Sequence, residues 1–191
     1  VICVDSGGHF TSEVYAYTRD RRKYNVVAIK GASQKDKPPI GKGKKLDLNW
    51  KGRTIKNGAE LFTVGTDTIK TTLFSRLRHN DVGAGYLHFN INADEEYFKQ
   101  LTAEKQIIRY VKGFPIREWV KKSSARNEAL DTLVYAYAGL HRLYQKRDRR
   151  TIWDNYEERG RIKGKIKDDK TYLDELRYKK KAQKPKFVSQ W

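Results

Sequence analysis

Residues 1–31 read VICVDSGGHFTSEVYAYTRDRRKYNVVAIKG, and this stretch decides the fold class. A short apolar run, residues 1–4, ends at Asp5 and a Ser-Gly-Gly turn, which is typical of a buried strand. A second apolar run, residues 25–29, closes on a Lys-Gly pair. Thr-Ser at the start of residues 11–22 predicts a capped helix between the two runs. Two short strands joined by a helix predict a βαβ unit with a parallel pair.

The elements expected further along the chain alternate between hairpins and helices. In order, they are a hairpin in residues 51–62 turning at Asn57-Gly58, a helix starting at Gly65, a strand at 86–89, a short helix at 94–101, a hairpin around Gly113-Phe114-Pro115, and a long helix after Ser123 or Ser124. These elements predict an α/β domain with a mixed sheet flanked by helices.

Charge divides the chain into a domain and a tail. The 191 residues carry 41 Lys and Arg against 23 Asp and Glu, a net charge of +18. From His141 onward there are 17 Lys and Arg against 8 Asp and Glu, with few aliphatic side chains. We therefore predict a folded domain at residues 1–146 and a basic C-terminal tail at residues 147–191. Such an excess of positive charge favours a polyanionic partner, most commonly nucleic acid.

Several classes of protein are disfavoured by what the sequence lacks. No apolar run approaches the ~20 residues of a membrane helix, and no signal peptide opens the chain. The single Cys3 excludes a disulfide framework and a cysteine zinc site, and the four histidines lack metal-ligand spacing. Gly41-Lys42-Gly43-Lys44 is not a Walker A loop, so no ATPase motor is expected. An intracellular setting is the simplest interpretation.

Three acids are candidates for a metal-dependent catalytic site. Asp5 ends a predicted parallel strand, where α/β sheets bind ligands, although the same position suits a turn or capping Asp. Asp131 lies in the long helix beside apolar residues, which is costly for an unpaired acid. Glu128, three residues earlier, shares that side of the helix, or is a first-turn acid favoured by the helix dipole. Carboxylate oxygens suit Mg²⁺ or Mn²⁺, and two such ions are a known device for phosphodiester cleavage.

Other polar residues have weaker claims to a site. Asp67 starts a helix, so a capping role competes with a catalytic one. Lysines around a Gly- and Pro-rich segment can grip backbone phosphates, or simply form a solvated surface. These candidate DNA-binding residues are Lys30, Lys37, Lys42, Lys44 and Lys45.

Five motifs occur in an order that resembles a known family. They are Asp5-Ser6-Gly7-Gly8, Ile29-Lys30-Gly31-Ala32-Ser33, Val64-Gly65-Thr66-Asp67-Thr68 with Lys70, Leu101-Thr102-Ala103-Glu104, and Arg126-Asn127-Glu128-Ala129-Leu130-Asp131. The ordered set resembles the C-terminal nuclease domain of the large terminase subunit of lambda-like tailed phages. The resemblance covers roughly residues 1–140.

The resemblance implies an RNase H-like fold and a two-metal endonuclease that cuts concatemeric viral DNA during packaging. It assigns the family's second acid to Asp5 and the helix acids to Glu128 and Asp131, and it places the first acid on a strand expected before Val1. It also implies Mg²⁺ or Mn²⁺ as cofactor, double-stranded DNA as substrate, and the host cytoplasm as location. The small terminase subunit and the portal protein are the expected partners of the full-length large subunit.

Two alternative functions stay open. Another RNase H-like enzyme, of the resolvase or transposase type, shares the acids but not the ordered motifs. A non-catalytic, basic DNA-binding module needs no clustered carboxylates, so metal titration distinguishes it from both nucleases.

Overall fold

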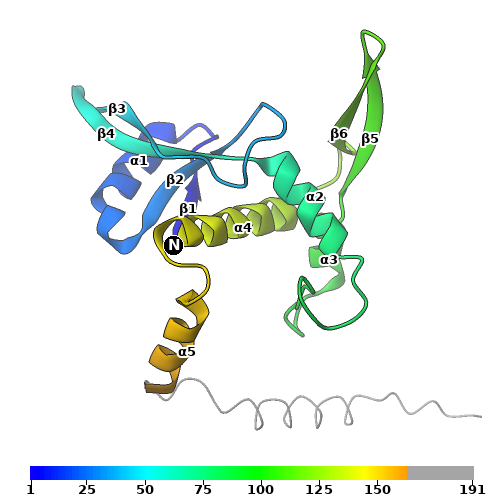
Figure 1. Ribbon diagram of the computed structural model, residues 1–191. Helices are drawn as coiled ribbons and strands as arrows, with labels where there is room; N and C mark the ends of the chain where they lie inside the picture. Colours follow the sequence, from blue (N-terminus) through cyan, green and yellow to red (C-terminus); the bar gives the residue numbers. More distant parts are fainter. Residues whose placement is uncertain (163–191) are drawn as a thin grey trace, which may run out of the picture. The chain divides into compact units, whose positions relative to one another are not determined.

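The computed structural model describes residues 1–162, so most of the predicted tail lies outside the described residues. Contacts divide the chain into a first unit, Val1–Lys146, and a second that begins at Arg147 and contains helix α5 (Ile152–Ile162). The first unit holds a four-stranded sheet, a separate two-stranded hairpin and four α-helices (Figure 1). None of the helices in residues 1–162 is long and apolar enough to cross a membrane.

The βαβ unit predicted from the first 31 residues is confirmed. Strand β1 (Ile2–Asp5) leads to helix α1 (Thr11–Asp20), a short 3₁₀ turn at Arg22–Tyr24, and strand β2 (Val26–Gly31). β1 and β2 pair in parallel, so both strands end at the same edge of the sheet. Residues 26–29 are all buried, because helices cover both faces of a parallel pair.

The predicted cap of helix α1 is wrong in detail. Phe10 occupies the N-cap position and makes no side-chain cap bond. The Thr11 hydroxyl instead donates to the backbone oxygens of Ser6 and Gly8, which ties the turn after β1 to the helix.

Strands β3 (Lys44–Trp50) and β4 (Arg53–Val64) complete the sheet in the order β1-β2-β4-β3. β4 pairs in parallel with β2 and antiparallel with β3, so the sheet is mixed, as the sequence predicts. The loop at residues 32–43 leaves the same edge of the sheet as Asp5.

The turn predicted at Asn57-Gly58 is wrong. The hairpin turns at Lys51-Gly52, both with positive φ. Asn57 lies inside β4, where its N–H donates to the Asp47 carboxylate at 2.8 Å and the register with β3 shifts. The Asn-Gly signal therefore marks an irregularity in the strand instead of its end.

Two hydrophobic clusters lie on the sheet. A small one joins helix α1 to strands β3 and β4; its buried members are Ala16, Leu48 and Ala59. The larger one includes side chains of helix α4 (Glu128–Lys146), the strongest helical pattern in the sequence. Its buried members are Val27, Ile29, Ile40, Phe62, Val64, Ile69, Leu73, Leu101, Leu130, Val134 and Ala138. The predicted long helix is confirmed, although it begins at Glu128, several residues after the two serines expected to precede it.

Helices α2 (Thr66–Arg76) and α3 (Glu95–Leu101) pack beside α4 and agree with the sequence prediction. Asp94 caps α3 by accepting from the Tyr97 N–H at 2.8 Å. The strand predicted at residues 86–89 does not form. That segment is a loop in which Phe89 packs edge-on against Tyr97 and Phe98.

The second predicted hairpin is confirmed and extends further than expected. Strands β5 (Glu104–Val111) and β6 (Phe114–Lys121) pair along their whole length around a Lys112-Gly113 turn. They form a two-stranded arm that stands out from the domain beyond α2 (Figure 1).

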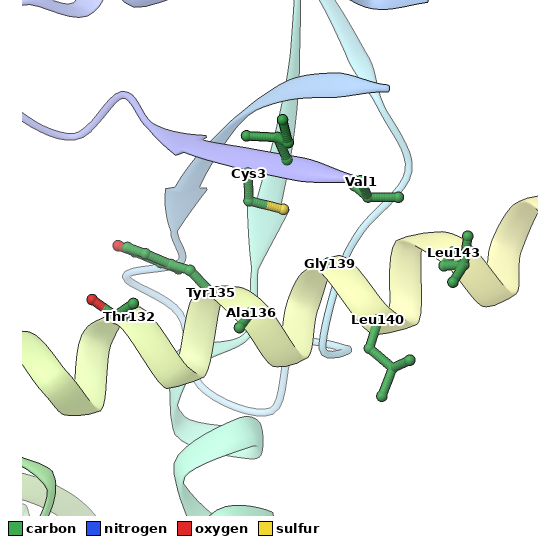
Figure 2. Close-up of a pocket in the computed structure, with 9 residues that line it drawn as sticks. Val1, Cys3, Thr132, Tyr135, Ala136, Gly139, Leu140 and Leu143 are labelled. Atoms are coloured by element: carbon green, nitrogen blue, oxygen red, sulfur yellow. The ribbon is translucent and has the colours of Figure 1, made fainter. Parts of the chain in front are cut away.

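Helix α4 passes close under β1. A Cβ on Gly139 would lie 3.3 Å from the Cys3 Sγ atom, so only glycine fits this approach comfortably. Because β1 is the edge strand, a groove of about 520 Å³ opens beside it. Figure 2 shows the apolar side chains of the strand and the helix that line this groove.

Candidate functional site

Asp5 lies exposed at the carboxyl end of β1. Its Oδ1 accepts a hydrogen bond from the Gly7 N–H at 2.9 Å. Asp5 therefore has the role of a turn residue, which is the alternative that the sequence left open. The Tyr135 hydroxyl of α4 donates a second hydrogen bond to the same carboxylate. Burial first, then the negative charges of Asp5 and Asp131, raises the pKa of Tyr135 to about 12, so this phenol stays protonated as a donor.

Asp131 lies on α4 at the same edge, half-buried between charged groups. Burial is the largest cause that raises its pKa, and the negative charges of Glu104, Asp5 and Glu128 raise it further. The Lys70 ammonium, 3.9 Å from Asp131 Oδ1, acts in the opposite direction. The structure therefore brings Asp5 and Asp131 into electrostatic reach of each other.

Lys70 and Glu104 form the most buried ion pair of the described residues, and sequence reasoning assigned no role to either. The Lys70 Nζ lies 2.9 and 2.8 Å from the two Glu104 carboxylate oxygens, and the side chains are 12% and 7% exposed. The Asn127 side-chain amide donates to Glu104 at 2.8 Å and to Asp131 at 3.2 Å. These bonds join α2, the start of β5 and the start of α4 into one network, which we call the acidic cluster together with Asp5 and Tyr135.

Glu128 is placed differently from the other two predicted acids. Its side chain is exposed and accepts from the Arg126 Nε at 3.3 Å. The pKa of Glu128 is lowered, chiefly because its carboxylate accepts from its own backbone N–H, and the hydrogen bond and charge of Arg126 lower it further. This arrangement matches a first-turn acid at the positive end of a helix, while its charge still acts on Asp131. A role as metal ligand stays a prediction.

Asp67 lies in the first turn of α2, whose N-cap is Gly65, and no side-chain cap bond forms there. It is not among the charges that shift the Asp131 pKa. Instead it lines a cleft of about 700 Å³ between α2 and the hairpin, together with Thr68, Arg117 and Trp119.

The five predicted DNA-binding lysines are all exposed. Lys30 belongs to β2, and Lys37 and Lys42 to the loop that follows it. Lys44 and Lys45 belong to β3 instead of the loop, where they pair with Leu61 and Glu60. The loop does leave the Asp5 edge of the sheet, as expected for a parallel β2.

A divalent metal fits the described residues only in part. Within residues 1–162, no group of three or more His, Cys, Asp or Glu side chains is arranged to hold a metal ion. Asp5 and Asp131 offer the hard oxygen atoms that Mg²⁺ and Mn²⁺ prefer. The Lys70 ammonium, however, already compensates Glu104 and part of the Asp131 charge.

The acidic cluster lies at the carboxyl edge of the parallel strands β1 and β2, the edge at which open α/β sheets generally bind their ligands. Over residues 1–152, the chain matches the family described as the endonuclease domain of the terminase large subunit gpA. It belongs to this family, which confirms the resemblance found in the sequence motifs.

Two curated relatives are terminase large subunits of bacteriophages. The chain is 36% identical to the subunit of Escherichia phage lambda over 146 residues, which cover 73% of this chain and 21% of that protein. It is 34% identical to the subunit of Enterobacteria phage P21 over 148 residues, which cover 73% of this chain and 22% of that protein. The chain thus spans about a fifth of the length of these relatives. No solved structure matches it significantly.

Proposed function

We propose that this domain is a metal-dependent endonuclease that cuts concatemeric double-stranded DNA during viral genome packaging. Membership of the terminase endonuclease family supports the reaction, and the net charge of +18 supports a polyanionic substrate. The full-length large subunit would act in the host cytoplasm with a small terminase subunit and a portal protein.

The observation that carries the proposal is the concentration of carboxylates in a strongly basic chain. Asp5, Glu104 and Glu128 all act on Asp131, and burial and repulsion together outweigh Lys70. Carboxylates held close together repel one another, and a bound divalent cation would offset this repulsion. Bound there, Mg²⁺ or Mn²⁺ would supply a Lewis acid and a hydroxide nucleophile. Asp5 and Asp131 are the residues that we expect to hold it.

The chain's own residues also orient the site. Tyr135 fixes the Asp5 carboxylate by a hydrogen bond, and Asn127 fixes Asp131 and Glu104 relative to each other. Lys70 holds Glu104 and offers a positive charge beside Asp131, suited to a phosphate oxygen.

We further propose that the complete site needs the acid expected on a strand before Val1 and that the fold is RNase H-like. The edge of β1 and the adjoining groove, which Val1 and Cys3 line, offer room for another strand along β1 (Figure 2). On this proposal, residues 1–191 alone bind DNA but cleave it poorly, because two carboxylates do not supply the ligands of two ions.

The test is nicking of plasmid DNA with Mg²⁺ or Mn²⁺ by a protein that includes the upstream residues. Asp5→Asn and Asp131→Asn should each lower the rate about 100-fold or more. Asp81→Asn, a change of an exposed loop acid, is the matched control and should leave the rate unchanged. Undiminished cleavage by either site variant would refute the assignment.

A non-catalytic DNA-binding module is the second candidate, favoured by the absence of a three-residue metal site within residues 1–162. Calorimetric titration with Mn²⁺ distinguishes the two. A nuclease that includes the upstream residues binds the ion and loses binding in Asp5→Asn, whereas a DNA-binding module shows no saturable binding.

A further inference from the structure

The tip of the β5–β6 hairpin exposes large apolar side chains. Phe114 is 73% exposed, Tyr110 71% and Ile108 61%, and Val111 beside them is also exposed. Tyr110 faces Pro115 across the two strands, and Val111 faces Phe114. Adjacent cross-strand pairs point to opposite faces, so Ile108 and Tyr110 lie on one face of the ribbon and Val111 and Phe114 on the other. Side chains of this size normally contribute to a core, so their exposure on both faces of the tip marks a binding element.

The outer part of the arm is held by its own strand pairing and turn. Lys112 and Gly113 have φ angles of 51° and 82°, as in the tight two-residue turns that match the twist of a hairpin. Ile107 and Ile116 are only half-buried, and neither belongs to a hydrophobic cluster. The apolar tip is therefore not needed to fold the arm.

The root of the arm, in contrast, is fixed beside the acidic cluster. Glu104, the first residue of β5, is the partner of Lys70. The Trp119 ring packs on Phe74 of α2 with 4.7 Å between centroids. The Lys35 Nζ donates to the Arg117 carbonyl oxygen at 2.5 Å. These contacts hold the arm at one position relative to Asp131.

The charge of the arm selects the chemistry of its partner. Residues 104–122 contain six Lys and Arg and two Glu. Glu104 is neutralised by Lys70, and Glu118 lies 3.5 Å from the Arg109 Nε. The exposed surface around the tip is thus basic, which matches a polyanion that also offers apolar surface. Duplex DNA has both, because phosphates line grooves whose floor is made of stacked bases.

We propose that the hairpin is a DNA-gripping arm, whose Tyr110 and Phe114 insert into a groove of the duplex while its Lys and Arg residues contact the flanking phosphates. A two-stranded ribbon fits the major groove, and apolar side chains can wedge between base steps of the minor groove. The seven residue steps from Glu104 to Val111 span about 24 Å. The tip therefore contacts DNA at most about seven base pairs from the site where the root of the arm lies. The inference rests on the proposed function, because it takes DNA as the substrate.

The test measures the affinity of the full chain for a fluorescent 30-base-pair duplex in EDTA, as a function of salt. Tyr110→Ser with Phe114→Ser should weaken binding about tenfold at every salt concentration, because apolar contacts release no counterions. Lys112→Asn with Arg117→Gln should instead flatten the log–log salt slope by about 2, and asparagine tolerates the positive φ at position 112.

Tyr24→Ser is the matched control. Tyr24 is 65% exposed but precedes β2, at the sheet edge opposite Asp5, and its loss should not change affinity. Duplex affinity in the tip variant equal to that of wild type, or equally reduced by Tyr24→Ser, would overturn the arm and assign the tip to a protein partner. Because metal is absent, this result is independent of cleavage. Arm-dependent binding, together with no metal-dependent nicking by a protein that includes the upstream residues, would support the arm and reject the nuclease.

Discussion

The two hairpins of this domain use the same turn and have opposite surroundings. Each turns on a Lys-Gly pair, Lys51-Gly52 and Lys112-Gly113, with nearly equal φ angles. The β3–β4 hairpin is built into the sheet, where Leu48 and Ala59 pack against helix α1. Among the described residues, the β5–β6 hairpin is anchored at its root and exposes its apolar tip. The same turn therefore connects a hairpin that contributes to the core and a hairpin that, on our proposal, binds DNA.

The largest change in stability is expected from breaking the Lys70–Glu104 ion pair, which fixes the root of the β5–β6 hairpin. Lys70→Met leaves the Glu104 carboxylate buried without its cation, which should lower the free energy of unfolding by about 3 kcal/mol. Urea denaturation measures this loss. Adding Glu104→Gln should recover most of it, because the uncompensated charge is then removed. A single variant as stable as wild type would show that the root is not fastened by this pair.

The next effect tests the built-in hairpin. Leu48→Ala removes a side chain that is almost fully buried between β3 and helix α1, and should cost about 2 kcal/mol in thermal or urea unfolding. Phe114→Ala is the matched change in the arm and should stay within about 0.5 kcal/mol of wild type. Equal losses of unfolding free energy in the two variants would show that the tip of the β5–β6 hairpin contributes to stability as much as the buried side chain of β3 does.

The turns themselves give a smaller effect that differs in kind. Gly52→Ala and Gly113→Ala each force alanine to a positive φ, at a local cost of about 1 kcal/mol, and a Cβ meets nothing within 4 Å at either site. In β3–β4 this cost should appear in global unfolding. In β5–β6 it should appear mainly as faster amide exchange within the hairpin. A fully global loss in both variants would mean that the arm folds with the core.

The smallest expected effect concerns the electrostatics where the arm joins the cluster. Because folding raises the pKa of Asp131, the folded metal-free protein holds this proton more tightly than the unfolded chain does, and stability is lost as pH rises through the folded-state pKa. Asp131→Asn should therefore raise the free energy of unfolding at pH 7 by about 0.5 kcal/mol, discounted for solvent screening. The gain should fade as pH falls below the ordinary aspartate value of 3.8. Urea unfolding at pH 7 and pH 3 checks the sign.

Sequence patterns predicted those elements whose signal is local. The βαβ unit and helix α4 follow from apolar runs and helical periodicity, and both are present. The prediction of a turn at Asn57-Gly58 failed because Asp47, ten residues away, accepts the Asn57 N–H. The left-handed backbone of Asn57 is accommodated as an irregularity within β4, and the strand continues. Lys51-Gly52, which forms the actual turn, carries a weaker turn signal.

At the candidate site, too, residues with a local sequence signal were predicted and residues that depend on distant partners were not. Asp5 and Asp131 are found by a strand end and by an acid on an apolar face, and the structure brings their charges together. Lys70, Glu104 and Tyr135 were missed, because their roles depend on partners far away in sequence. A lysine beside the buried Ile69 and an acid opening an apolar strand were the available signals. Neither specifies its partner without the fold.

The close approach of Gly139 to Cys3 provides a chemical reporter. Cys3 is the only cysteine of the chain, so a thiol-reactive label marks this position alone. Its side chain lines the groove between β1 and α4, and burial raises the pKa of its thiol, which slows alkylation at neutral pH. A polypeptide strand laid along β1 would cover the sulfur and slow labelling further. The rate of alkylation at Cys3 therefore reports, without any measurement of cleavage, whether the edge of the sheet is covered.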